Sequence, residues 1–252
     1  MKKLLLVSLA ILMSALAYAD KGYDLSKHAE KVNKGFQGMQ TDMQMILINA
    51  HGDEVKRSML GKVQERKDKG DQSMFVFKTP TDVKGTKMLT WVNKEGSDDQ
   101  WLFLPSLKRV KRINSSNKKG SFMGSEFSYE DLSAQEVEKF TYKYLKEADV
   151  SGRAVHVIER YPKEKKSGYS KQTVYLDKEY NHPVKIEYYD RKSELLKVGV
   201  FSGFNKVKTW WFFDKIEISN VQTRKKSILT WANRKVEIKF PKGQFDSKKL
   251  AL

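Results

Sequence analysis

Residues 88–104 read MLTWVNKEGSDDQWLFL, and this stretch indicates which kind of secondary structure builds the protein. Two apolar runs, residues 88–92 and 101–104, flank the polar segment 94–99, which contains Gly, Ser and Asp. Short apolar runs rich in aromatic residues on both sides of a turn-forming segment are typical of a β-hairpin. We therefore expect two antiparallel strands here.

The same pattern of short strands and turns continues in both directions along the chain. Upstream, strands are expected at 43–48, around 59–63 and at 74–77. Downstream, they are expected at 140–145, 155–161, 173–176, 184–189, 195–201, 210–218 and 227–232. Roughly eleven to thirteen strands at intervals of about ten residues are typical of an antiparallel sandwich or barrel. The sequence therefore predicts a mainly β protein.

One segment before these strands has helical spacing instead. Its apolar residues recur every three or four positions, at Leu25, Ala29, Val32 and Phe36. This spacing predicts one face of a helix that covers the core. Asp24 or Ser26 is a suitable cap for its start, and Gly35 and Gly38 are suitable for its end.

The N-terminus, residues 1–19, has the features of a secretory signal peptide. Two lysines precede an apolar run over residues 4–17, and Ala17 and Ala19 supply the small residues of a cleavage site. An uncleaved anchor is the alternative, but the run is shorter than the roughly 20 residues that span a bilayer. We expect cleavage after Ala19. No linker rich in Pro, Gly or Ser divides residues 20–252, which are expected to form a single domain.

The charge and the cysteine content limit the possible partners. The 252 residues include 48 Lys and Arg against 31 Asp and Glu, and loss of two signal-peptide lysines lowers the formal charge from +17 to +15. The absence of cysteine excludes disulfides, thiolate chemistry, Cys-ligated metals and a lipidated N-terminal Cys. An exported basic protein meets anionic membrane surfaces and acidic proteins, so nucleic acid is not expected as a partner. The short basic clusters at 108–112, 118–119 and 224–226 are equally consistent with a solvated surface.

No catalytic motif is visible in the sequence. It lacks the G-x-S-x-G elbow, the H-E-x-x-H motif and the P-loop, and its four histidines follow no ligand spacing. We therefore expect no enzyme activity, no metal and no cofactor. A curved sheet with an apolar interior is suited to hold a lipid chain, and nine methionines suit an adaptable lining. The alternative is that these side chains simply fill a core.

The longest stretch without a strand pattern is residues 114–127, NSSNKKGSFMGSEF. Ser128 follows and precedes YEDL, residues 129–132, which resembles a capping box at the start of a short helix. A loop of this length is often a functional lid. A surface loop held in place by Phe122 and Phe127 is the alternative.

A longer block, residues 101–132, carries a family pattern. The matching residues are Trp101, Leu104, Pro105, Arg109, Arg112, Ile113, Phe122, Gly124, Ser125, Glu126, Phe127, Tyr129, Glu130, Asp131 and Leu132. In this order they closely resemble the signature of the LolA-like outer membrane lipoprotein-sorting family. The match is conservative at Glu126, where Asp is more usual. Phe245 and Leu250 also lie where members of that family usually end.

This resemblance implies a fold and a function. The implied fold is a strongly curved antiparallel sheet that forms a half-open barrel, with an N-terminal helix and a loop or short helix as cover. The implied function is that of a non-enzymatic periplasmic carrier or sensor, which binds the acyl chain of a lipid or lipoprotein and has an inner-membrane transporter as a partner. The alternative is an interaction module of an envelope lipid-export or efflux complex with no transported ligand.

Two sets of candidate site residues follow from the block and the hairpin before it. The expected ligand-binding residues are aromatic or apolar: Trp91, Trp101, Phe103, Phe122, Met123, Phe127 and Tyr129. The expected polar latch pairs a basic residue with an acidic one, drawn from Arg109, Arg112, Glu126, Glu130 and Asp131. If the segment is a lid, Gly120 and Gly124 are its expected hinges. If it is rigid, the same residues fix it to the barrel.

Overall fold

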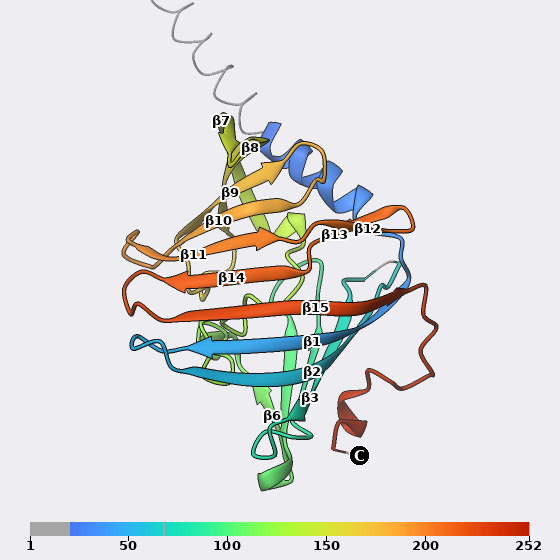
Figure 1. Ribbon diagram of the computed structural model, residues 1–252. Coiled ribbons are helices and arrows are strands. Elements are labelled where there is room, and N and C mark those ends of the chain that lie inside the picture. The colour runs from blue at the N-terminus through green and yellow to red at the C-terminus, as the bar shows by residue number, and fades with distance from the viewer. Residues whose placement is uncertain (1–20, 68, 252) are drawn as a thin grey trace, which may run out of the picture.

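The structure is a computed structural model that describes residues 21–67 and 69–251. The expected signal peptide and its cleavage at Ala19 lie outside these residues. The main element is one antiparallel sheet of thirteen strands, which confirms the mainly β prediction (Figure 1).

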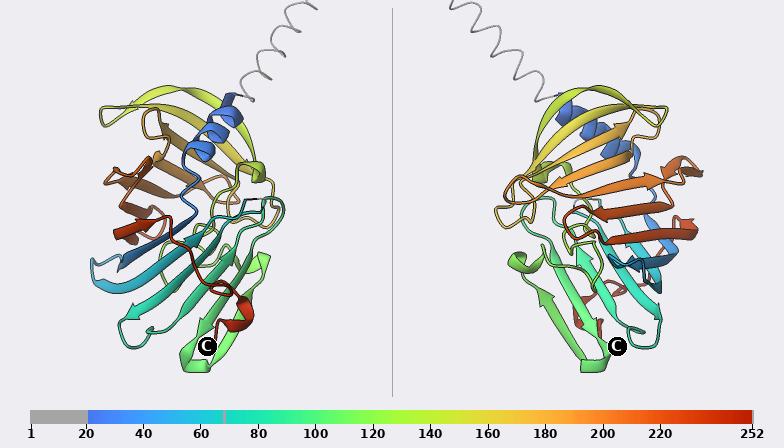
Figure 2. Two further views of the ribbon diagram at one scale, coloured as in Figure 1. Left: turned by 90° about the vertical axis from the view of Figure 1, so that its right-hand side faces the viewer. Right: turned by 60° about the vertical axis from the view of Figure 1, so that its left-hand side comes forward.

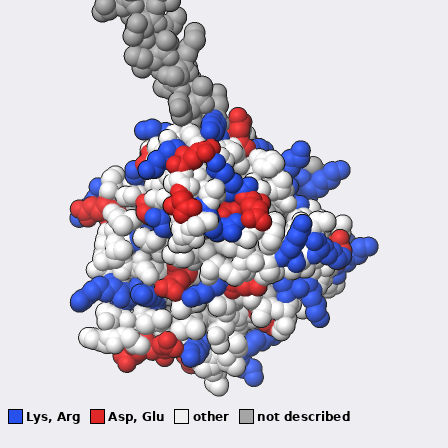
Figure 3. Space-filling view, turned by 45° about the horizontal axis from the view of Figure 1, so that its top comes forward, with Lys and Arg blue, Asp and Glu red and all other residues white. Residues whose placement is uncertain are grey.

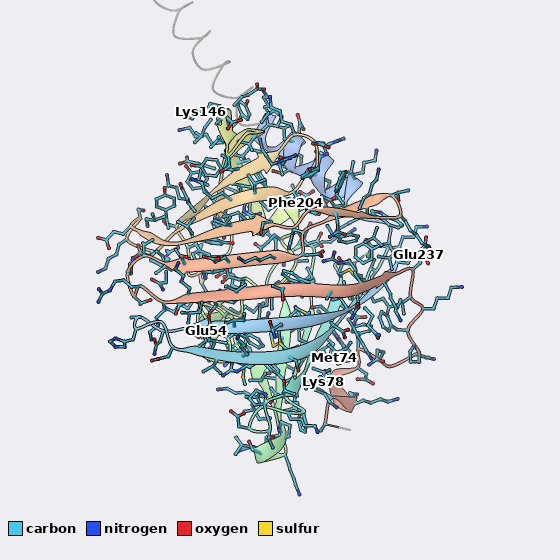
Figure 4. The ribbon with its side chains drawn as sticks, viewed as in Figure 1. Glu54, Met74, Lys78, Lys146, Phe204 and Glu237 are labelled. Carbon is cyan, nitrogen blue, oxygen red and sulfur yellow. The ribbon has the colours of Figure 1, made fainter. Side chains whose placement is uncertain are left out.

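The sheet has two halves, each with its strands in chain order. The first half contains β1 (Gly38–Ile48), β2 (Glu54–Gln64), β3 (Gln72–Thr79), β4 (Lys87–Trp91), β5 (Asp99–Leu104) and β6 (Arg109–Ile113). The second contains β7 (Phe140–Val150), β8 (Arg153–Pro162), β9 (Lys171–Asp177), β10 (Pro183–Tyr189), β11 (Leu195–Ser202), β14 (Lys215–Asn220) and β15 (Lys226–Val236). The halves join where β1 pairs with β15, so that β6 and β7 are the two edges. Glu54, the first residue of β2, and Glu237, which follows β15, lie at opposite sides of the sheet (Figure 4).

The sheet is strongly curved and does not close into a barrel (Figure 2). This confirms the half-open arrangement that the family resemblance implies.

The single strand expected over residues 210–218 was wrong, because a separate hairpin, β12 (Asn205–Val207) with β13 (Trp210–Phe212), precedes β14. Edge strand β6 was not predicted, since its basic residues look like a surface charge cluster. Charged side chains are common on sheet edges, where they discourage pairing with another chain.

An α-helix over residues 21–32 lies across one end of the curved sheet (Figure 1). Leu25 and Ala29 face the core as expected, but Val32 is 40% exposed, so its place on the buried face was wrong. The caps expected at the start of the helix, Asp24 or Ser26, were also wrong, because both residues lie inside the helix. The Ser26 hydroxyl donates to the carbonyl of Gly22, one turn earlier, at 2.8 Å.

The two faces of the sheet carry separate apolar clusters because neighbouring side chains of a strand point to opposite sides. On β4, Met88 belongs to the main cluster on the concave side, whereas Leu89 belongs to an outer cluster. The C-terminal segment covers this outer cluster through Phe245 and Leu250. Met74 of β3, which lies beside this segment in Figure 4, belongs to the same cluster.

Residues 114–133, called the plug below, fill part of the concave side. The short helix expected over residues 129–132 was wrong, because this part of the plug is a turn. The capping-box hydrogen bonds nevertheless form. The Ser128 amide donates to the Asp131 carboxylate at 2.6 Å, and the Asp131 amide donates to the Ser128 hydroxyl at 3.2 Å. Four short 3-10 helices complete the described chain: η1 (Pro105–Leu107), η2 (Ser115–Asn117), η3 (Val137–Lys139) and η4 (Ser247–Lys249).

Within residues 21–67 and 69–251, no helix combines the length and the apolar character needed to cross a membrane.

Candidate functional site

A cavity of about 500 Å³ lies between the concave face of the second half of the sheet, the helix and the end of the plug. Its apolar wall comes from inward-facing side chains of β8, β9, β10, β11 and β14: Ile158, Val174, Leu176, Ile186, Tyr188, Phe201, Ile216 and Ile218. The alternation of each strand produces this wall, since every second residue points inward. Its volume falls within the roughly 300–1,000 Å³ that is typical of small-molecule sites.

The helix and the β12–β13 hairpin close one end of the cavity. Asn33, at the end of the helix, donates to the carbonyl of Asn181 at 2.7 Å, and the indole of Trp210 donates to the carbonyl of Lys34 at 2.9 Å. His182 lies at this end with Nε2 at 2.7 Å from the carbonyl oxygen of Trp211. Burial lowers the pKa of His182, which favours its neutral form.

A group of charged side chains borders the cavity near the helix. The Lys34 ammonium lies 3.2 Å from the Glu136 carboxylate and 3.5 Å from the Glu30 carboxylate. Asp71, which is 9% exposed, lies at the same border. Burial raises the pKa of Asp71 from 3.8 to about 6, although Lys34 opposes this shift.

This shift predicts a pH dependence of stability. Above pH 3.8 the folded protein holds the Asp71 proton more tightly than the unfolded chain does, so stability falls as the pH rises through about 6. At about 1.4 kcal/mol per pKa unit, the penalty approaches roughly 3 kcal/mol above pH 7. We expect the Asp71→Asn variant to gain stability over the wild type progressively between about pH 4.5 and 7.5. Urea unfolding of both proteins across this range measures the difference, and parallel curves would contradict the prediction.

A buried ion pair holds the plug to β11. The Lys197 ammonium lies 2.6 Å from the Asp131 carboxylate, and the two side chains are 4% and 6% exposed. Lys197 also donates to the carbonyl of Glu126 at 2.8 Å, and the Tyr169 hydroxyl donates to Asp131 at 2.8 Å. These hydrogen bonds satisfy the groups that burial removes from water, as a buried pair requires.

The other acidic side chains of the plug bind neutral partners. The Glu126 carboxylate accepts a hydrogen bond from the amide group of Asn220 at 2.7 Å. The Glu130 carboxylate accepts from the Ser167 hydroxyl and, at 2.9 Å, from the Gly168 amide. Burial raises the pKa of Glu130.

The expected arginine latch was therefore wrong, because Lys197 is the basic partner of Asp131. Arg112 lies on edge strand β6, is 66% exposed and pairs with Asp99. Arg109 is exposed on the same strand. One sequence signal for the true partner existed: Lys197 shares its strand face with Phe201, so a basic residue occupies an inward position of an apolar strand.

The expected ligand-binding residues fall into three groups. Phe127 lines the cavity, as do Glu130 and Asp131 of the expected latch. Phe122, Met123 and Tyr129 belong to the main core beneath the plug and do not line the cavity. Trp91, Trp101 and Phe103 lie on the opposite face of the sheet, where they pack against the outer cluster; the Trp91 indole donates to the carbonyl of Phe245 at 2.8 Å. These three residues do not face the cavity as expected, because the two-residue period of their strands places their side chains on the outer face of the sheet.

The part of the chain that the structure describes contains no group of three or more His, Asp or Glu residues placed to hold a metal ion.

A curved, unclosed antiparallel sheet with a helix and a loop over its concave face is the architecture of LolA-like proteins. A family model described as "-like: Uncharacterized protein" matches residues 69–251. The crystal structure of an outer membrane lipoprotein-sorting protein domain from Vibrio parahaemolyticus is 39% identical, with a TM-score of 0.90, and the match covers 93% of this chain and 100% of that one. The chain therefore belongs to the LolA-like outer membrane lipoprotein-sorting family.

Two further solved structures are similar. A DUF1329 family protein from Desulfovibrio piger is 29% identical, with a TM-score of 0.88, and the match covers 92% of this chain and 99% of that one. A LolA superfamily protein from Nitrosomonas europaea is 16% identical, with a TM-score of 0.70 over 88% of this chain and 96% of that one, and supports the fold alone. No curated protein matches the chain. These relatives indicate no enzymatic family.

Proposed function

We propose that the chain is a non-enzymatic periplasmic carrier or sensor that binds the acyl chain of a lipid or lipoprotein in the concave cavity. The observation that carries this proposal is the apolar wall of the cavity, formed by side chains such as Val174, Leu176 and Ile186. An acyl chain has no polar groups along its length, so apolar walls and an opening suffice to bind it. Family membership supports the same class of ligand. The proposal includes export of residues 20–252 as one domain and delivery of the ligand by an inner-membrane transporter.

Two measurements test the acyl-chain ligand. Organic extraction of the purified protein, followed by mass spectrometry, should yield acyl chains. In addition, the fluorescent apolar probe N-phenyl-1-naphthylamine should bind the delipidated protein and be displaced by an alkyl-chain amphiphile. A protein that binds neither acyl chains nor the probe would contradict the proposal.

A matched pair of substitutions locates the binding. Ala29 faces the cavity from the helix, so Ala29→Phe should fill part of the space and weaken probe binding. Val200 lies on β11, is 47% exposed and points away from the cavity, so Val200→Phe should leave probe binding unchanged. Equal effects of the two substitutions would place the probe elsewhere.

The basic surface predicts binding to anionic membranes. Figure 3 shows basic side chains spread across the face that it draws, with acidic side chains between them. At +15, the mature protein should float with vesicles that contain anionic phospholipid, because each basic residue near such a surface contributes up to about 1 kcal/mol. Salt should weaken this binding, since charges are screened over about 8–10 Å at physiological ionic strength. Equal recovery with neutral phosphatidylcholine vesicles would contradict the prediction.

A further inference from the structure

A half-buried arginine side chain lies at the wall of the cavity. Arg160 follows Ile158 by two positions on β8, so both side chains point to the concave side and line the cavity. The guanidinium lies 4.6 Å from the centre of the Phe140 ring, which is buried. The Arg160 Nε donates to the side-chain oxygen of Gln172 at 2.6 Å, and Gln172 is also buried.

The rest of this guanidinium has no partner. Among the described residues, no acidic side chain forms an ion pair with Arg160, and its two terminal nitrogens make no hydrogen bond. Burial also lowers the pKa of Arg160, because it removes the charge from water. Two basic residues with buried side chains differ: Lys197 has Asp131 as its partner, and Arg234 has Asp214.

The nearby acidic groups do not neutralise Arg160. Glu130 and Asp131 both line the cavity and favour the charged form of the guanidinium. However, Asp131 is paired with Lys197, and Glu130 is held by Ser167 and Gly168. Burial raises the pKa of Glu130.

We propose that Arg160 binds the anionic head group of a single-chain amphiphile, such as a fatty acid, that lies wholly inside the cavity. This inference rests on the proposed acyl-chain function and narrows its ligand class. Because Gln172 occupies Nε, the two terminal nitrogens present a free edge that matches the two oxygens of a carboxylate. A phosphate monoester offers the same oxygens. The acyl chain then lies along the apolar wall.

This placement distinguishes two kinds of acyl ligand. A lipoprotein inserts only its acyl chains and keeps its polypeptide outside the cavity, so it places no anionic group beside the Arg160 guanidinium. A free acid carries its charge into the cavity, where a desolvated carboxylate needs a hydrogen-bonded partner.

The test compares three probes with the same alkyl chain: dodecanoic acid, dodecyl phosphate and dodecan-1-ol. Each displaces N-phenyl-1-naphthylamine from the delipidated wild type, from Arg160→Met and from Arg160→Lys at neutral pH. The wild type should bind an anionic probe about tenfold to a hundredfold more tightly than the alcohol, because charge-assisted hydrogen bonds strengthen binding by this amount. Arg160→Met should lose this preference and keep its affinity for the alcohol.

Two further variants make the result specific. Arg160→Lys keeps the charge but not the forked geometry, so its preference should fall between those of the wild type and Arg160→Met. Arg112→Met removes one exposed charge from edge strand β6 and should behave as the wild type. The anion that binds more tightly identifies the head group as a carboxylate or a phosphate.

Two outcomes separate the inference from the function on which it rests. Equal binding of the acid and the alcohol by the wild type, or a preference that persists in Arg160→Met, would overturn the role of Arg160 while leaving the acyl-chain carrier intact. Failure of the wild type to bind any of the three probes would overturn the carrier proposal itself. Circular dichroism of each variant confirms that it is folded, and Arg160→Lys carries the test if Arg160→Met does not fold.

Discussion

Replacement of Lys197 by methionine should lower the free energy of unfolding by about 3–5 kcal/mol, the usual effect of removing one partner from a buried ion pair. The change leaves the Asp131 carboxylate, 6% exposed, without its charged partner. It also removes the donor to the carbonyl of Glu126, so the plug loses two attachments to β11 at once. Urea unfolding measured at neutral pH gives the loss directly.

An exposed pair provides the control. Lys27 is 47% exposed and pairs with Glu30 and Glu138, so Lys27→Met should cost no more than about 1 kcal/mol. The double variant Lys197→Met with Asp131→Asn should recover part of the loss, because no buried charge then lacks a partner. A loss below about 1 kcal/mol for Lys197→Met alone would mean that the ion pair does not hold the plug.

Phe122→Ala should also lower the free energy of unfolding by about 3–5 kcal/mol, because it deletes a fully buried aromatic side chain. Phe122 has no exposed surface, and its ring contacts those of Phe77 and Tyr129, with ring centres 5.8 and 5.6 Å away. A moving lid would lose little stability on this change, whereas a rigid plug must lose much. The burial of Phe122 favours the rigid plug.

The double variant Phe122→Ala with Phe127→Ala separates stability from ligand retention. Phe127 lines the cavity and is 3% exposed, so the double variant removes one side chain from the core beneath the plug and one from the cavity wall. We expect a large drop in the urea midpoint, with the acyl probe still retained below the unfolding transition. A small drop in stability with rapid loss of the probe would instead establish a lid.

Much of the fold could be predicted because strands and turns leave a local signal. The alternation and the turn at residues 94–99 placed β4 and β5 correctly. The signal failed where tertiary context decides the outcome. Ser128 and Asp131 form the hydrogen bonds of a capping box, yet residues 129–132 are a turn, and Asp131 also pairs with Lys197 of β11.

The site was harder to predict than the fold, because side-chain direction depends on the phase of each strand. An error of one residue moves a side chain to the other face of the sheet. Trp91, Trp101 and Phe103 were chosen for their aromatic character, but their phase directs them to the outer cluster. Arg160 was missed for the opposite reason: a lone arginine in a strand that also carries Glu159 and Tyr161 gives no sign that it faces inward.

The pairing of β1 with β15 joins the two halves of the sheet. Hydrogen bonds across this seam link residues that are 191 positions apart, as between Thr41 and Ala232. Among the described residues, strands β1 to β6 pair with one another, as do β7 to β11 with β14, and β15 at residues 226–236 provides the strand pairing that joins the two groups. Contacts between distant residues also slow folding. The sheet therefore depends on its most distant pairing, because residues close to the end of the chain must be present before strand pairing joins the two halves.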